Sequence, residues 1–301
     1  MNSGHNQGFM SAPSSPIDHY ENFPVASWLC PPRLRPPIAA IYHFARTADD
    51  IADEGVASAD DRLADLAAYR ADLHAVAAGQ AASARWPQVF EPLAGQIAAF
   101  KLPLKPLDDL LSAFAQDVAK TRDGAGYADM VELLDYCSRS ANPVGRLLLH
   151  LYGVRDEEAL VESDAICTAL QLINFWQDLS EDISRGRYYL PLEDCAAHGI
   201  HIEEPARDFP RLRQGADVAG LVAASVRDAE NRMLAGAPLV HRIPGRAGWE
   251  LRAVVQGGLR ILDKIKAIDH ATLVHRPTLG KADALPVFWR MLRMRKKTNT
   301  G

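Results

Sequence analysis

Cysteine is scarce in this chain, with four residues in 301: Cys30, Cys137, Cys167 and Cys195. None of them forms a CxxC pair, and none is spaced from a histidine in the way that zinc ligands are. A disulfide framework would need denser cysteine in a shorter chain. The cysteine pattern therefore predicts a reduced, cytoplasmic protein without a structural zinc site.

Basic residues are not in excess, because 33 Lys and Arg stand against 38 Asp and Glu and the formal net charge is -5. Binding to a phosphate backbone needs a basic surface, so no nucleic-acid partner is expected. No apolar run approaches the ~18 residues of a transmembrane helix. Residues 1–16 are rich in Ser, Gly, Asn and Pro and lack the apolar stretch of a signal peptide, so we expect a disordered N-terminal lead-in there.

Strand signals are also scarce, since alternation of β-branched or aromatic residues with polar ones hardly occurs. Helical periodicity recurs instead along an Ala- and Leu-rich chain whose apolar fraction is 48%. No Gly/Ser-rich or charged linker divides the middle of the chain. We therefore predict one all-α domain over residues 17–285 and a basic tail over residues 286–301. The expected helices cover residues 35–53, 59–77, 90–100, 107–120, 127–152, 157–184, 216–234 and 249–267.

A first polar stripe lies in the helix expected at residues 35–53. Four side chains, three of them polar, are spaced i, i+4, i+7 and i+11 and therefore share one helical face. A polar stripe that faces a core needs a ligand or an ion to compensate its burial. An acidic pair at helical spacing is, taken alone, more often a solvated surface. The four residues are Tyr42, Arg46, Asp49 and Asp53.

A second polar stripe runs through an apolar segment that contains Phe175 and Trp176. Buried carboxylates are costly unless they are paired or bound to a metal, and oxygen ligands suit Mg²⁺, which also binds substrate phosphates. Two such helices face to face would form a pocket for a diphosphate, with Arg46, Arg185 and Arg187 nearby in the sequence. The second stripe, spaced i, i+3, i+7 and i+11, consists of Gln171, Asn174, Asp178 and Asp182.

These motifs together resemble the squalene/phytoene synthase family of head-to-head prenyl synthases, over about residues 19–276. The two stripes resemble the two aspartate-rich motifs of that family, and residues 185–191 are similar to the basic segment that follows the second motif. Residues 136–145 lie where family members carry a Tyr-Cys…Ala-Gly-Thr-Val-Gly segment. Residues 19–27 and 140–145 look like the branch that makes hydroxysqualene in bacterial hopanoid synthesis.

The resemblance implies the all-α isoprenoid synthase fold, with a central cavity and a Mg²⁺ site that binds three ions. It also implies the reaction: presqualene diphosphate ionises, the C30 cation rearranges, and water captures it to give hydroxysqualene and diphosphate. Arg46 and the metal would stabilise the leaving diphosphate. No nicotinamide cofactor is expected, and Gly124-Ala-Gly126 lacks the third glycine of a dinucleotide motif. The implied metal ligands are Asp49, Asp53, Asn174, Asp178 and Asp182.

The same resemblance implies further substrate contacts, each of which has a structural alternative. Tyr136 would hold the diphosphate or the cation, but a buried tyrosine often bonds a backbone carbonyl. A late arginine would contact the diphosphate, but it also fits the surface. A histidine would cap the pocket and two amides would place water or ligand, yet all three also fit structural roles. The implied contacts are Tyr42, Arg46, Tyr136, Arg185, Arg276, His19, Asn142 and Gln171.

Two positions depart from the family pattern: Asn142-Pro143 replaces Gly-Thr, and Gly258 stands near where several members carry a pocket tyrosine. A condensing synthase, which joins two farnesyl diphosphates to presqualene diphosphate or squalene, is the alternative enzyme. A catalytically silent helical scaffold or lipid-binding protein is a third alternative, which the two acidic stripes disfavour. The aromatic and basic tail fits peripheral contact with an anionic membrane, and it equally fits a solvated tail. The sequence predicts no oligomeric state.

Overall fold

The structure is a computed structural model that describes residues 30–243 and 245–294. Every regular element in these ranges is helical, and an isolated bridge joins Gly126 to Tyr188, so the all-α prediction is confirmed. The α-helices are α1 (Arg35–Asp53), α2 (Ala59–Ala77), α3 (Pro87–Phe100), α4 (Leu104–Asp123), α5 (Met130–Ser140), α6 (Asn142–Tyr152), α7 (Glu157–Gln177), α8 (Leu179–Ser184), α9 (Leu192–Ala197), α10 (Pro205–Asp208), α11 (Ala216–Gly236), α12 (Gly245–Ala267) and α13 (Ala284–Arg293). Short 3₁₀ helices are η1 (Pro32–Leu34), η2 (Phe209–Arg211), η3 (Ala237–His241) and η4 (Lys281–Asp283).

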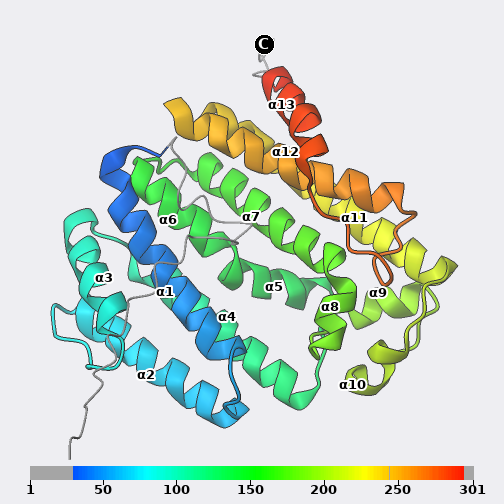
Figure 1. The fold of residues 1–301 in the computed structure, drawn as a ribbon, viewed down its shortest axis with the longest axis horizontal. Helices are drawn as coiled ribbons and strands as arrows, with labels where there is room; N and C mark the ends of the chain where they lie inside the picture. The colour runs from blue at the N-terminus through cyan, green and yellow to red at the C-terminus, as the bar shows by residue number, and fades with distance from the viewer. Residues whose placement is uncertain (1–29, 244, 295–301) are drawn as a thin grey trace, which may run out of the picture.

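Helix α7 lies at the centre of the molecule (Figure 1) and packs against α5, α6, α11 and α12. Its side chains join one hydrophobic cluster, in which Trp176 is fully buried. A second cluster joins α1, α2, α3 and α4 around Phe44 and Tyr69. Tyr152 of α6 packs against both clusters. Helices α1 and α7, which carry the two predicted stripes, therefore belong to different clusters of the core.

The prediction of one continuous helix over residues 127–152 is wrong, because the structure has two helices there, α5 and α6. Asp129 caps α5 by accepting a hydrogen bond from the Glu132 amide at 2.8 Å. Helix α5 then ends before Ala141, and Pro143 stands in the first turn of α6. Proline lacks an amide hydrogen and clashes with the preceding turn, so it is favoured at a helix start and interrupts a helix interior.

The helix predicted over residues 157–184 is also divided, at Asp178 between α7 and α8. The interruption is slight, since the Asp178 amide donates to the Asn174 carbonyl at 2.8 Å and the Asp182 amide donates to the Asp178 carbonyl at 2.9 Å. Asp178 and Asp182 thus stay one hydrogen-bonded turn apart, although no single regular helix carries the whole stripe.

The C-terminal residues predicted as a tail begin inside α13, which continues from η4 and packs on α12. Other predicted helices agree with the structure within a few residues at each end. Across both described ranges, no helix combines the length and the apolar character that a bilayer span requires.

Candidate active site

The last turns of α1 place two aspartates beside an arginine of the same helix. Arg46 forms ion pairs with Asp49 at 3.1 Å and with Asp50 at 2.6 Å. Burial, together with the charge of Asp53 one turn away, raises the pKa of Asp49 to about 6. Tyr42, one turn before Arg46, is buried in the core beneath this set. The α1 stripe is therefore a crowded set of partly buried carboxylates, as its spacing predicted.

The second stripe presents its side chains from the end of α7 and from α8. Arg276 binds the Asp178 carboxylate with two hydrogen bonds, from Nε at 2.6 Å and from Nη2 at 3.0 Å. Burial, together with the neighbouring charge of Asp178, raises the pKa of Asp182 to about 7. Gln171 and Asn174 are half-buried on the preceding turns of α7. These residues come together at one end of the central helix.

Arg187, in the loop after α8, joins the two stripes. Its guanidinium forms an ion pair with Asp53 of α1, where the Asp53 side chain is 24% exposed. The same guanidinium lies near enough to Asp49 and to Asp182 to lower the pKa of each, against the larger effect of burial. A single cation that acts on carboxylates from α1 and α8 shows that the two stripes face one site.

Asp117 of α4 is a further carboxylate at this site, and the sequence analysis missed it. The Tyr136 hydroxyl donates a hydrogen bond to Asp117 Oδ2 at 2.5 Å. Burial raises the pKa of Asp117 to about 7, with smaller opposing contributions from Tyr136 and Arg187 and an added one from Asp53. A signal existed, since Asp117 follows the buried Phe114 by three residues and so stands on the apolar face of α4.

An aromatic wall lies beside the carboxylates. Phe175 and Tyr189 stack with ring centroids 3.7 Å apart and planes at 14°, and Tyr136 packs against both rings at 6.2 Å. Phe44, by contrast, packs against Tyr69 at 5.2 Å within the core of α1, α2 and α3. The wall therefore consists of Tyr136, Phe175 and Tyr189, while Phe44 belongs to the core.

Two of the residues predicted to contact substrate do not join this group of carboxylates and aromatic rings. Asn142 is buried between α6 and α7, where its Oδ1 accepts a hydrogen bond from the Thr168 hydroxyl at 2.9 Å. This pairing matches the structural alternative for that amide. Arg185 is exposed at the end of α8, and its charge lowers the pKa of Asp182. His19 lies outside the described residues.

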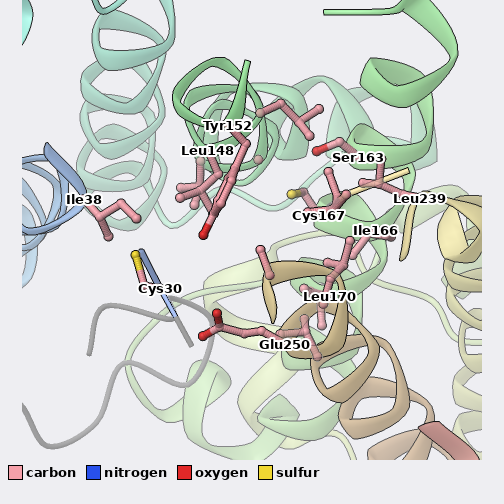
Figure 2. Close-up of a pocket in the computed structure, with 17 residues that line it drawn as sticks. Cys30, Ile38, Leu148, Tyr152, Ser163, Ile166, Cys167, Leu170, Leu239 and Glu250 are labelled. Atoms are coloured by element: carbon pink, nitrogen blue, oxygen red, sulfur yellow. The ribbon is translucent and has the colours of Figure 1, made fainter. Parts of the chain in front are cut away.

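An apolar cavity opens between α6, α7 and the first half of α12 (Figure 2), and Leu148, Ile166 and Leu170 are among its walls. Its volume is about 110 Å³, it is partly open to solvent, and nearly all of its lining is apolar. Leu170 is one turn from Asn174 on α7, so one helix connects the cavity with the carboxylate site. Its few polar groups include Tyr152 at the end of α6, Ser163 on α7 and Glu250 on α12.

Gly258 is tightly enclosed. A Cβ added there would lie 2.9 Å from Met233 Cε and 3.2 Å from Leu170 Cδ2. The missing side chain therefore lets α12 approach α7 and α11, and neighbouring side chains fill the space. The departure at Gly258 does not enlarge the cavity.

The donor atoms of the site suit a hard cation that shares a phosphate. No three carboxylate, imidazole or thiol side chains in residues 30–243 and 245–294 are close enough to hold an ion by themselves. Mg²⁺ uses one or two carboxylates and completes its shell with substrate phosphate oxygens and water. The carboxylates of α1 and α8, whose pKa values are raised by burial and then by neighbouring carboxylates, fit that mode better than an all-protein cage.

Comparison with known proteins identifies the family. The model of the squalene/phytoene synthase family matches residues 18–283. The chain belongs to this family. It is 33% identical over 262 residues to a hydroxysqualene synthase of Sinorhizobium fredii, covering 86% of this chain and 84% of that protein. It is 38% identical to a hydroxysqualene synthase of Zymomonas mobilis, covering 68% and 67%.

Solved structures agree with this assignment. A crystal structure described as squalene synthase HpnC from Alicyclobacillus acidocaldarius is 35% identical, with a TM-score of 0.74 over 84% of this chain and 90% of that one. A dehydrosqualene synthase with a bound ligand has a TM-score of 0.71 at 22% identity, over 88% of each chain, which supports the fold. The predicted isoprenoid synthase fold is thus confirmed, and the chain is an enzyme that uses prenyl diphosphates.

Proposed function

We propose that this enzyme is a hydroxysqualene synthase, which converts presqualene diphosphate and water into hydroxysqualene and diphosphate. The observation that carries the proposal is the convergence of carboxylates from α1, α4 and α8 around Arg187, with an apolar cavity further along α7. Three relatives named hydroxysqualene synthase, at 33% to 39% identity, support the choice of reaction within the family.

The diphosphate would bind at the carboxylate end of α1 and α7. Bound Mg²⁺, three ions by family resemblance, would supply Lewis-acid stabilisation of the charge that develops on the leaving group. Arg46, Arg187 and Arg276 each pair with a carboxylate of the site in this structure. In the complex these guanidinium groups would bind diphosphate oxygens, for which their geometry is well suited. The proposed metal ligands are Asp49, Asp53, Asn174, Asp178 and Asp182.

The aromatic wall would face the carbocation that ionisation leaves behind. Aromatic faces attract a cation by about 0.5–2 kcal/mol, and Tyr136 and Tyr189 present electron-rich phenol rings. Asp117 would act as a positioning residue, since it fixes the Tyr136 hydroxyl and thereby the ring. The apolar cavity would hold the C30 chain away from bulk water until a single water molecule captures the rearranged cation.

Other features of the proposal follow from the chemistry. Water capture is redox-neutral, so no nicotinamide cofactor takes part. The substrate and product are lipophilic, which favours peripheral contact with the inner face of a membrane. The cytoplasmic location is inferred from the cysteine pattern of the sequence.

The decisive experiment is incubation with presqualene diphosphate and Mg²⁺, with and without a reduced nicotinamide, followed by mass analysis of the product. Hydroxysqualene formed equally in both reactions is expected. Squalene formed only with the nicotinamide would contradict water capture.

A condensing synthase is the competing function, because a presqualene diphosphate synthase of Zymomonas mobilis is 33% identical over 64% of this chain and 63% of that protein. Incubation with farnesyl diphosphate alone tests it. We expect no turnover, whereas a C30 diphosphate product would favour condensation.

A further inference from the structure

Helix α13 presents its most apolar face outward. Leu285, Phe288, Trp289 and Leu292 are spaced i, i+3, i+4 and i+7, the spacing that normally turns a helix face toward a core. Here these side chains are 74%, 54%, 54% and 46% exposed, in the same order. We call these four residues the α13 face. It is a contiguous stripe of large apolar side chains with no cover in the described part of the chain.

The outward orientation of the α13 face is fixed by contacts on other sides of the helix. Arg290 forms an ion pair with Asp263 of α12 at 2.6 Å. Arg252 of α12 donates hydrogen bonds to the carbonyls of Met291 at 3.2 Å and Met294 at 2.9 Å. Helix α13 therefore rests on the outer side of α12, as Figure 1 shows, and cannot turn its apolar stripe inward without losing these bonds.

The sequence of α13 and of the residues that follow it is basic. Residues 284–301 contain five basic and no acidic residues, although the whole chain has a formal charge of -5. Arg293 lies over the Trp289 ring at 4.8 Å, and Arg252 lies over the exposed Trp249 ring at 4.6 Å. Aromatic and leucine side chains flanked by Lys and Arg are typical of helices that lie in the headgroup region of anionic bilayers.

We propose that the α13 face and Trp249 form a docking surface for an anionic lipid bilayer, with the axis of α13 parallel to the membrane. Phe288 and Trp289 insert at the boundary of headgroups and acyl chains, while the basic residues bind lipid phosphates. A second copy of this chain is a poorer occupant, because two α13 faces would bring like charges together.

Docking brings the cavity close to lipid, an implication that rests on the proposed function. Ala247, Glu250 and Leu251 of α12 line the cavity, whereas Arg252 and Asp263 hold α13 on the other side of the same helix. Helices α12 and α13, each about 10 Å in diameter, then separate the cavity from the bilayer. A C30 substrate and its product would travel a short path between the membrane and the cavity.

Vesicle flotation of the full chain tests the docking surface without using catalysis. We expect binding to vesicles of equal phosphatidylglycerol and phosphatidylcholine, weak binding to phosphatidylcholine alone, and release at high salt. The double variant Phe288→Glu/Trp289→Glu should bind at least tenfold more weakly, and Arg293→Gln about fivefold more weakly. The matched control is Val131→Glu on α5, which is 75% exposed and lies on another helix.

Absence of vesicle binding by the wild-type chain would overturn the proposal, and so would equal binding by the wild type and the double variant. A double variant that loses a dimeric mass but keeps vesicle binding would assign the α13 face to a second copy instead. Activity on detergent-dispersed presqualene diphosphate should stay unchanged in the double variant. If docking is found but that substrate is not converted, the proposed function fails while the membrane surface stands.

Discussion

The two carboxylate stripes of the site are both proposed to bind Mg²⁺, but different contacts hold them in place. The α1 stripe lies on one unbroken helix and has an arginine, Arg46, on the same helix. The second stripe crosses the junction of α7 and α8, and the arginine on Asp178 comes from 98 residues further along the chain. One half of the site is thus a local product of helical periodicity, whereas the other depends on tertiary contacts.

The geometry of the second stripe is therefore set by a loop as well as by a helix. Gln177, buried at the last residue of α7, donates a hydrogen bond to the Pro277 carbonyl at 2.8 Å. Pro277 adjoins Arg276, so this one bond fixes the segment that delivers the guanidinium to Asp178. We expect the α1 stripe to tolerate changes in that segment and the second stripe to respond to them.

The largest effect should come from removing one carboxylate in either stripe, as in Asp178→Asn and Asp53→Asn. Each change keeps the side-chain shape and removes a charge proposed to bind Mg²⁺, so diphosphate release should fall about 10³-fold in both. Initial rates with presqualene diphosphate measure it. Glu193→Gln, at an exposed position on α9 away from the site, is the control and should stay near wild type. A loss smaller than tenfold in one stripe would show that the stripes are not equivalent.

Arg187 is the direct link between the stripes, and its loss should have the next largest effect. In Arg187→Gln the diphosphate loses a cation placed between α1 and α8, so we expect kcat/KM to fall about 10²-fold. Arg185→Gln, two residues away and exposed, should change it only a few-fold. Equal losses in the two variants would mean that local positive charge matters more than the position of Arg187 between the stripes.

Much of this site could be predicted from the sequence, because helical spacing alone brings Asp49 next to Asp53. The partnership of Arg187 with Asp53 could not, since it joins segments more than a hundred residues apart through the packing of α1 against the loop after α8. Asp117 was missed for a different reason: its place on the apolar face of α4 indicates burial, but a lone carboxylate has no neighbour in the sequence that links it to the two stripes.

The boundary between α5 and α6 was missed although the sequence contains a signal for it. Pro143 is a signal for the start of α6 that the apolar periodicity of residues 127–152 obscured. The outward direction of α13 depends on contacts from Arg252 and Asp263 of another helix, which periodicity does not encode. Local pattern thus predicts which residues share a face, whereas tertiary packing decides what that face meets.

Asp117 lies on α4, outside both stripes. Its raised pKa predicts how the stability of the protein depends on pH. Its pKa is raised from 3.8 to about 7, so between these values the native protein keeps a proton that the unfolded chain has released. Native stability therefore falls as pH rises from about 4 to about 7. Asp117→Asn cannot ionise, so its Tm relative to wild type should be higher at pH 8 than at pH 5.

Thermal unfolding in a metal-chelating buffer across this pH range measures the effect. Asp135→Asn is the matched control, because Asp135 lies on α5 with a side chain that is 65% exposed. We expect its Tm profile to parallel that of the wild type. A parallel profile for Asp117→Asn as well would mean that the Asp117 carboxyl does not titrate differently in the native protein.

The smallest effect should come from Gln177→Leu, which tests whether the second stripe depends on its loop. Leucine fills a similar volume but leaves the buried Pro277 carbonyl without its donor, a cost of about 1–3 kcal/mol. If this bond positions Arg276, KM for presqualene diphosphate should rise a few-fold while kcat changes little, because a positioning contact is lost. Thr278→Ala, an exposed change beside Pro277, should alter neither value. A lower Tm with an unchanged KM would show that Gln177 stabilises the fold without positioning Arg276. The difference between the two stripes would then depend only on the contact between Arg276 and Asp178.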